Sequence, residues 1–180
     1  LTTGPKTKQF ERDLSAYVGS THAVALNSCT AALHLALEAV GVGPGDEVVL
    51  TPMTFGATAN VVCHLGATPV FADIEADTAC IDATRIESAL TPRTKAILPV
   101  DFAGQPPDLD AIMAIARRHG LPVIEDAAHS IGAEYKGRRI GGIADMTAFA
   151  FYATKNITSG EGGALTTNNA AWAERAMIMS

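Results

Sequence analysis

The chain has 180 residues, of which 48% are hydrophobic, 18% charged and 6% aromatic, and its formal net charge is −6. This apolar content excludes intrinsic disorder, and the length suits one domain large enough to bury a core. A net acidic chain without a block of lysines and arginines lacks the basic surface that binds nucleic acid, so we exclude a nucleic-acid partner.

Two stretches without Asp, Glu, Lys or Arg, 18–37 and 48–72, raise the question of a membrane span. Polar residues interrupt the first stretch, and Pro52 and Pro69 break the second, so we interpret both as buried core and expect no membrane partner. The N-terminal segment lacks the apolar run of a signal peptide. Three cysteines without metal-ligand spacing indicate reduced thiols, a cytoplasmic location and no metal site.

Apolar runs and helical patterns alternate along the whole chain. In chain order we expect strand 23–26, helix 30–40, strand 47–51, helix 55–65, strand 69–73, helix 83–90, strand 96–100, helix 109–119, strand 121–124, strands 146–152 and 163–167, and a helical segment 170–179. The strands read as continuous apolar runs, which indicates burial on both faces. The sequence therefore predicts an α/β fold with three layers, α/β/α, around a mostly parallel sheet.

Ligands of such sheets bind at the carboxyl ends of the strands. Four segments that can carry chemistry follow predicted strands: 27–30, 52–55, 125–129 and 152–163. Ser28, Cys29 and Thr30 stand at the start of a predicted helix, where free N–H groups and the helix dipole can hold a phosphate. The alternative for this segment is an ordinary N-cap by Ser28 or Thr30.

Asp126 comes directly after the predicted strand 121–124, where a carboxylate could keep a heteroaromatic nitrogen protonated. Its alternative role is to cap a short helix that begins at Ala127. His129 follows three residues later, so one helical turn would bring it near Asp126, although an isolated histidine can equally be structural. Both assignments stay open when each residue is taken alone.

Phe55 and Tyr152 stand at strand ends, where an aromatic ring can stack on a planar ligand or simply belong to the core. Lys155 follows a buried apolar strand and precedes a glycine-rich loop, so its amine is a candidate nucleophile toward an aldehyde, the alternative being a solvated lysine at a turn. Together, a phosphate site, a stacking ring, a carboxylate and an amine are the groups that pyridoxal 5′-phosphate requires.

The chain also resembles a known family, the DegT/DnrJ/EryC1/StrS sugar aminotransferases, which have the aspartate aminotransferase fold (fold type I). The resemblance covers nearly the whole chain. Its motifs are GDEV at 45–48, TPMTF at 51–55, GATPVFAD at 66–73, TPRTKAILPV at 91–100, EDAAHS at 125–130 and ATKNITSGEGG at 153–163.

The resemblance implies a role for each candidate residue. Lys155 matches the lysine that forms the Schiff base with the cofactor, and Asp126 matches the partner of the pyridine nitrogen. His129 matches the position beside the phenolic oxygen and Phe55 the stacking ring, while Ser28 belongs to the phosphate-binding helix start at which Cys29 and Thr30 match phosphate-contacting positions. One position departs from the family, which usually has a serine five residues before the lysine, where this chain has Ala150.

The resemblance further implies transfer of an amino group from an amino-acid donor, typically glutamate, to a nucleotide-linked keto sugar. Two alternatives remain: a non-catalytic regulatory or interaction protein of the same fold, and a sugar dehydratase, which Lys155 disfavours because the dehydratases carry histidine there. Family members are usually homodimers of about twice this length. We therefore expect residues 1–180 to form most of the large cofactor-binding domain, with the small C-terminal domain absent from this chain.

Overall fold

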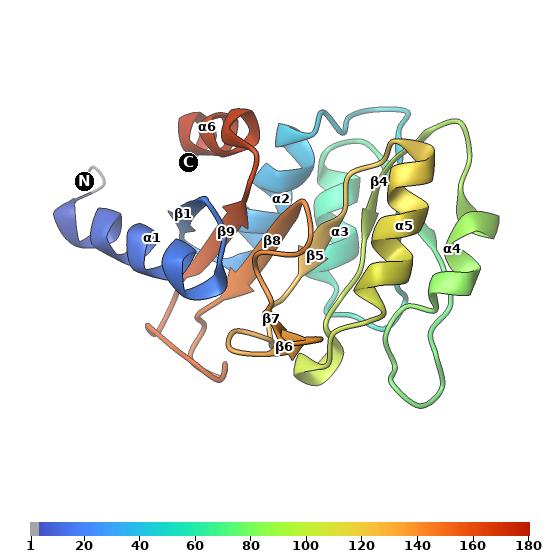
Figure 1. Ribbon diagram of the computed structural model, residues 1–180. Coiled ribbons are helices and arrows are strands. Elements are labelled where there is room, and N and C mark those ends of the chain that lie inside the picture. The colour runs from blue at the N-terminus through green and yellow to red at the C-terminus, as the bar shows by residue number, and fades with distance from the viewer. Residues whose placement is uncertain (1–3) are drawn as a thin grey trace.

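The computed structural model describes residues 4–180 and contains a β-sheet between two layers of helices (Figure 1). One part of the sheet has the strand order β1-β9-β8-β5 and the other has the order β3-β2-β4. Isolated parallel bridges from Ile97 to Val123 and from Val100 to Asp126 connect β4 to β5, so the two parts form one continuous sheet. The strands are β1 His22–Leu26, β2 Glu47–Leu50, β3 Thr68–Phe71, β4 Thr94–Leu98, β5 Ile124–Asp126, β8 Met146–Ala150 and β9 Gly163–Thr167.

The pairings β2–β3, β2–β4 and β5–β8 are parallel, whereas β9 runs antiparallel to both of its neighbours, β1 and β8. Because β9 is reversed, its first residue, Gly163, lies beside the last residues of β1 and β8. The expected α/β fold with a mostly parallel sheet is confirmed, with this one reversed strand.

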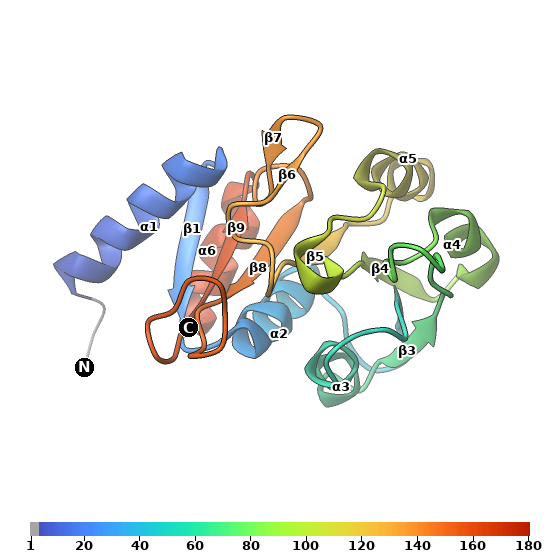
Figure 2. The ribbon, with the colours of Figure 1, turned by 90° about the horizontal axis from the view of Figure 1, so that it is seen from below.

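Helices cover both faces of the sheet (Figure 2). The helices are α1 Pro5–Val18, α2 Cys29–Ala39, α3 Ala57–His64, α4 Ala83–Ala89, α5 Leu109–His119 and α6 Ala170–Met179, with a short 3₁₀ turn η1 at Phe102–Gly104. Buried side chains of α2, α3 and α6 form one core cluster with the sheet. The opposite face is covered by α4 and α5 over one half and by α1 over the other.

The predicted elements are present, with ends that differ by at most three residues, but β5 required a correction. The sequence placed a strand at 121–124 with Asp126 beyond its end, whereas β5 runs Ile124–Asp126 and Asp126 is its last residue. Hydrogen bonds from Asp126 N to Pro99 O and from Asp101 N to Asp126 O hold this end of the strand against the chain after β4. The turn that follows is not a helix, so Asp126 does not cap one.

Helix α1, a two-stranded hairpin and the 3₁₀ turn η1 were not predicted. Helix α1 buries only Leu14 and Val18, and most of its other side chains are polar, so its apolar signal is weak. The hairpin of β6, Glu134–Tyr135, and β7, Arg138–Arg139, has strands of two residues, too short for an alternating pattern. Lys136 and Gly137 connect these strands with positive φ angles, which glycine adopts readily.

Within residues 4–180, none of the helices combines the length and the apolar composition needed to cross a membrane. The three cysteines, Cys29, Cys63 and Cys80, are free thiols.

Candidate active site

A cavity of about 670 Å³ opens at the carboxyl ends of β1, β5 and β8. All seven residues that the sequence singled out as cofactor contacts line it: Ser28, Cys29, Thr30, Phe55, Asp126, His129 and Lys155. They come from segments far apart in the chain, and the topology of the sheet brings them together as the strand-end rule predicts. Ala150 and Tyr152 line the same cavity.

The start of α2 forms one wall of this cavity. Ser28 is the N-cap, since its backbone is extended and its Oγ accepts a hydrogen bond of 3.1 Å from Ala31 N. The ordinary capping role is therefore real and uses the Ala31 N–H, so the N–H groups of Cys29 and Thr30 stand at the cavity end of the helix, where an anion is favoured. Gly163 packs so closely against this turn that a Cβ atom would lie 2.2 Å from Ser28 C, so any larger residue would displace it.

The Asp126 carboxylate lies at the floor of the cavity and is 5% exposed. Its Oδ2 accepts a hydrogen bond of 2.8 Å from Thr58 Oγ1, and its Oδ1 accepts one of 3.2 Å from Ala128 N. Burial raises the pKa of Asp126, while the donors Thr58 and Ala128 and the charge of Lys155 act in the opposite direction. A buried carboxylate fixed by several donors can hold a cationic partner in one position.

Cys29 is the first residue of α2, and its side chain points to Asp126. Its Sγ lies 3.7 Å from Asp126 Oδ1 and 3.6 Å from Ala148 O, both within reach of a weak S–H donor. Burial, and after it the charge of Asp126, raises the pKa of the Cys29 thiol well above its ordinary value, so the thiol stays protonated. Cys29 can therefore offer an anion its backbone N–H, while its thiol supports Asp126.

Lys155 follows β8 in a turn in which its backbone N donates to Tyr152 O at 2.9 Å. Its ammonium charge influences three neighbours in the cavity, Cys29, Asp126 and His129. The pKa of His129 is lowered chiefly by burial and then by the charge of Lys155, so the imidazole is mainly neutral at neutral pH. Lysine, histidine and carboxylate thus act on one another within one site.

The aromatic residues of the site lie at its mouth. Phe55 is 83% exposed and Tyr152 48% exposed, so their rings are free to contact a ligand or a second polypeptide. Ala150 is buried and presents only a methyl group where a hydroxyl was expected from the family pattern.

These residues fit pyridoxal 5′-phosphate. The cavity combines a helix start for the phosphate, an accessible aromatic ring, a buried carboxylate and an amine. Asp126 discriminates best, because it is an acid buried beside a cavity. Among residues 4–180, Lys155 is the cation that acts on its charge.

Sequence reasoning missed Thr58, which holds Asp126, and Thr54, whose Oγ1 lies 2.6 Å from Thr58 Oγ1. It also missed Asp101, which lines the cavity, and gave no separate role to Glu125. Asp101 follows β4, so the strand-end rule applied to that strand would have found it. The contact between Thr58 and Asp126 joins residues 68 positions apart and had no signal in the sequence.

Comparison with known proteins agrees with this geometry. The family model described as the DegT/DnrJ/EryC1/StrS aminotransferase family matches residues 1–180. The chain is 58% identical over 180 residues to the spore coat polysaccharide biosynthesis protein SpsC of Bacillus subtilis, covering 100% of this chain and 46% of that protein. The chain thus spans about half the length of the curated relatives that it matches.

Three solved structures share the fold closely. DesV of S. venezuelae in complex with a ketimine intermediate has a TM-score of 0.95 and 45% identity, covering 98% of this chain and 48% of that one. The PLP-form of Spr1654 from Streptococcus pneumoniae has a TM-score of 0.95 and 41% identity, covering 100% and 51%. DesI in the presence of its TDP-sugar product has a TM-score of 0.94 and 39% identity, covering 98% and 45%.

A family match over every residue, relatives of high identity and a cavity with the expected groups lead to one conclusion. The chain belongs to the DegT/DnrJ/EryC1/StrS aminotransferase family.

Proposed function

We propose that the protein uses pyridoxal 5′-phosphate to move an amino group from an amino acid, glutamate, to a nucleotide-linked keto sugar. The observation that carries this proposal is the meeting of Lys155 and the buried Asp126 in one cavity. The TDP-sugar product bound to DesI supports a nucleotide-linked sugar as the substrate class. When bound, the cofactor supplies an electron sink for the bond that breaks at the carbon bearing nitrogen.

Each residue then has a defined task. The Asp126 carboxylate holds a proton on the ring nitrogen, and the Thr58 hydroxyl keeps that carboxylate in position. The N–H groups at the start of α2 bind the phosphate, and Phe55 stacks on the ring. The Lys155 amine would hold the cofactor through its aldehyde and, once free, would be the base and acid that moves a proton in the site. His129, mainly neutral, can hydrogen-bond the phenolic oxygen.

The proposal includes a homodimer, residues 1–180 as most of the large cofactor-binding domain, and a cytoplasmic location. The exposed Phe55 and Tyr152 at the mouth of the cavity support a second copy as cover for the site. The three free cysteines support a reducing compartment.

The test is covalent fixation of the cofactor. After incubation with pyridoxal 5′-phosphate and reduction with borohydride, peptide mass analysis should find the added mass on Lys155. Lys155→Arg, which keeps the charge but has no free amine of the same reactivity, should lose both the added mass and the visible absorbance. Lys95→Arg on β4 is the matched control, because Lys95 lies outside the cavity. A wild-type protein that takes up no cofactor contradicts the proposal.

Addition of glutamate then separates an enzyme from a binding protein. An aminotransferase should change the cofactor absorbance and release 2-oxoglutarate in a stoichiometric amount. An absorbance that does not change with any amino acid would instead support a non-catalytic protein that retains the fold and the cofactor.

A further inference from the structure

Two carboxyl groups that the proposed chemistry does not use lie buried next to Asp126. Asp101 is 1% exposed and Glu125 is fully buried. Asp101 follows β4, and its backbone N donates to Asp126 O, while Glu125 immediately precedes Asp126 in β5. The backbone of each acid is therefore linked directly to that of Asp126, by a hydrogen bond for Asp101 and by a peptide bond for Glu125.

In each of the two acids, one carboxyl oxygen accepts a hydrogen bond and the other does not. Ser130 Oγ donates to Asp101 Oδ2, and Thr147 Oγ1 donates to Glu125 Oε2 at 2.9 Å. The other oxygens, Asp101 Oδ1 and Glu125 Oε1, are buried and have no hydrogen-bond donor among the residues that the structure describes. A buried, ionised oxygen without a donor is destabilising, so two in one place need an explanation.

The charged groups around Asp101 and Glu125 do not stabilise two ionised carboxylates. Asp126 adds a third acid to the cluster. Cys80 also feels the charge of Asp101, but its pKa is raised, mainly by burial, so the thiol is uncharged. A proton on Asp101 solves both difficulties, because it turns Asp101 into a donor to Glu125 and removes one charge. The pKa of Asp101 is raised, first by burial and next by the charge of Glu125, and burial raises the pKa of Glu125 to about 7.

We propose that Asp101 and Glu125 share one proton, and that this proton-linked pair is a positioning unit that fixes the ends of β4 and β5 and hence the Asp126 carboxylate. The positioning role rests on the proposed function, whereas the shared proton does not. Because the pair carries one negative charge instead of two, Asp126 can ionise in the same buried cluster.

The shared proton can be tested without cofactor. In the full chain at neutral pH, infrared spectra should show the carbonyl stretch of a protonated carboxylic acid. Asp101→Asn should abolish that band, because the amide donates to Glu125 with no extra proton. Asp110→Asn on the surface should leave the band unchanged. Absence of the band from the wild type, or its persistence in Asp101→Asn, would overturn the proposal.

The positioning role is tested by conservative rescue. Asp101→Ala leaves Glu125 Oε1 without a donor, while Thr147 still donates to Oε2, and it should weaken binding of pyridoxal 5′-phosphate about tenfold. Asp101→Asn, which keeps a neutral donor, should bind within about threefold of wild type, since the retained hydrogen bond preserves most of that energy. Equal damage in the two variants would show that an ionised Asp101 is needed and would overturn the proposal. If the wild type binds no cofactor, the proposed function fails while the infrared result still decides the shared proton.

Discussion

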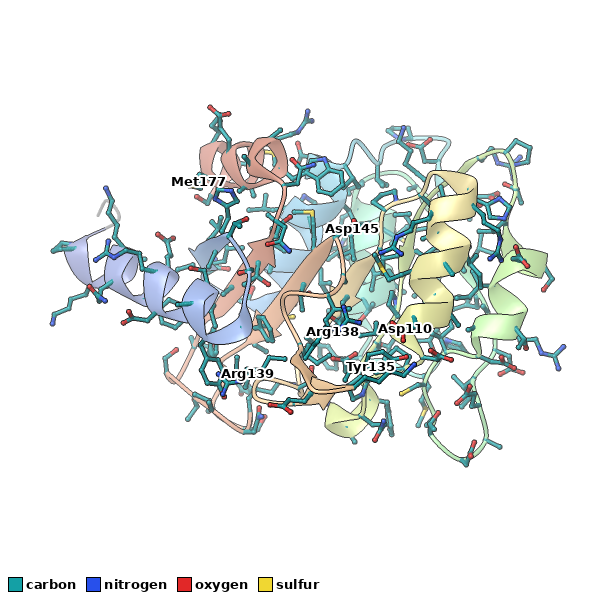
Figure 3. The ribbon with its side chains drawn as sticks, in the orientation of Figure 1. Asp110, Tyr135, Arg138, Arg139, Asp145 and Met177 are labelled. Atoms are coloured by element: carbon teal, nitrogen blue, oxygen red, sulfur yellow. The ribbon has the colours of Figure 1, made fainter. Side chains whose placement is uncertain are left out.

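Two clusters of carboxyl groups lie close together in the sequence and behave in opposite ways. The buried cluster consists of Asp101, Glu125 and Asp126 beside the cavity. The surface cluster consists of Asp108 and Asp110 at the start of α5, which contact Tyr135, Lys136 and Arg138 of the β6–β7 hairpin. Figure 3 shows Asp110 beside Tyr135 and Arg138.

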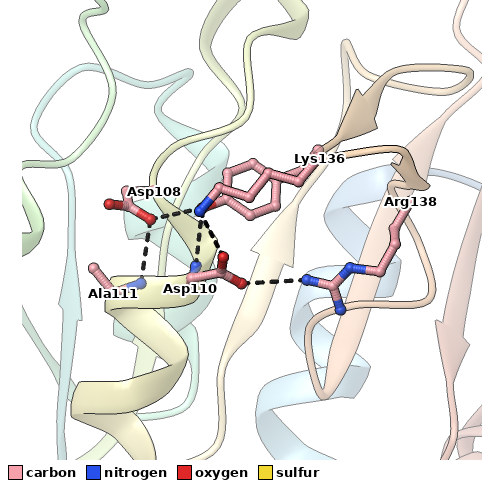
Figure 4. A network of polar contacts seen from close by, with 6 residues as sticks. Asp108, Asp110, Ala111, Lys136 and Arg138 are labelled. Atoms are coloured by element: carbon pink, nitrogen blue, oxygen red, sulfur yellow. Dashed lines mark hydrogen bonds and ion pairs between the residues drawn. The ribbon is translucent and has the colours of Figure 1, made fainter.

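In the surface cluster every acid has a donor or a cation. Tyr135 Oη donates to Asp108 Oδ1 at 2.6 Å, and Asp110 pairs with Lys136 at 2.6 Å and with Arg138 at 3.2 Å (Figure 4). The pKa of Asp108 is lowered chiefly by Tyr135, and the pKa of Asp110 chiefly by Lys136. Exposed acids with partners stay charged and attach the hairpin to α5.

In the buried cluster the donors are hydroxyl, thiol and amide groups, and in the part of the chain that the structure describes the nearby ammonium is that of Lys155. Burial therefore dominates, and it raises the pKa of all three acids. The comparison teaches that solvent access and the type of partner, not the identity of the side chain, decide whether an acid serves stability or chemistry.

The largest effect should follow from Asp126→Asn. Because the amide cannot carry the charge that stabilises a protonated ring nitrogen, the rate of the proposed reaction should fall by about 10²-fold or more. Steady-state kinetics with glutamate and the cofactor in excess measure this loss. The matched variant Asp110→Asn removes an acid of the surface cluster and should leave the rate unchanged, and equal losses in both would refute the distinction.

The two clusters should change the free energy of unfolding in opposite directions as the pH rises. Glu125 has a folded pKa raised from about 4.5 to about 7, so its contribution is fully present below pH 4.5 and disappears as the pH rises through 7. Asp108 and Asp110 have lowered values, so their contribution is present above pH 4 and disappears as the pH falls further. Urea unfolding at several pH values measures both contributions. Glu125→Gln should remove the loss of stability as the pH rises through 7 and leave the loss below pH 4 unchanged.

An intermediate effect should follow from Thr147→Val. The variant keeps the shape of the side chain but removes the donor to Glu125 Oε2, so a buried acceptor loses its partner at a cost of about 1–3 kcal/mol. Urea unfolding near pH 7 measures the difference in the free energy of unfolding. Thr84→Val, at an exposed hydroxyl that donates to Asp82, is the control and should have little effect. A stable Thr147→Val protein would mean that Glu125 finds another donor.

The smallest effect should follow from Asp110→Ala. Exposed ion pairs gain little because water screens them, so the unfolding midpoint should stay near that of wild type. Any small loss should vanish in about 1 M salt, where the screening length is only a few ångströms. A large loss that persists in high salt would show that the hairpin depends on Asp110 for more than charge.

Much of the molecule could be predicted from the sequence because local signals are strong. The buried strands are continuous apolar runs, such as Met146–Ala150, and α5 shows its apolar positions at helical spacing between an Asp N-cap and Gly120. The rule that ligands bind at strand ends selected segments that do line one cavity. For Ser28, proposed as part of a phosphate site with an ordinary N-cap as the alternative, the N-cap is observed.

The tertiary structure alone decided features that depend on partners far away in the chain. The reversed direction of β9 brings Gly163 against Ser28. The Cys29 thiol contacts Asp126, which lies 97 positions away. Helix α1 was missed because its few apolar residues gain burial only when β1 and the segment around Ile140 pack against them.

The sequence by itself determined the fold class and the residue types of the site, since apolar periodicity and strand ends are local properties of the chain. It did not determine which acids would be charged. That depends on the solvent access and the donors that each carboxyl meets after folding, and these separate the proton-sharing pair proposed for Asp101 and Glu125 from the ion-paired Asp108 and Asp110.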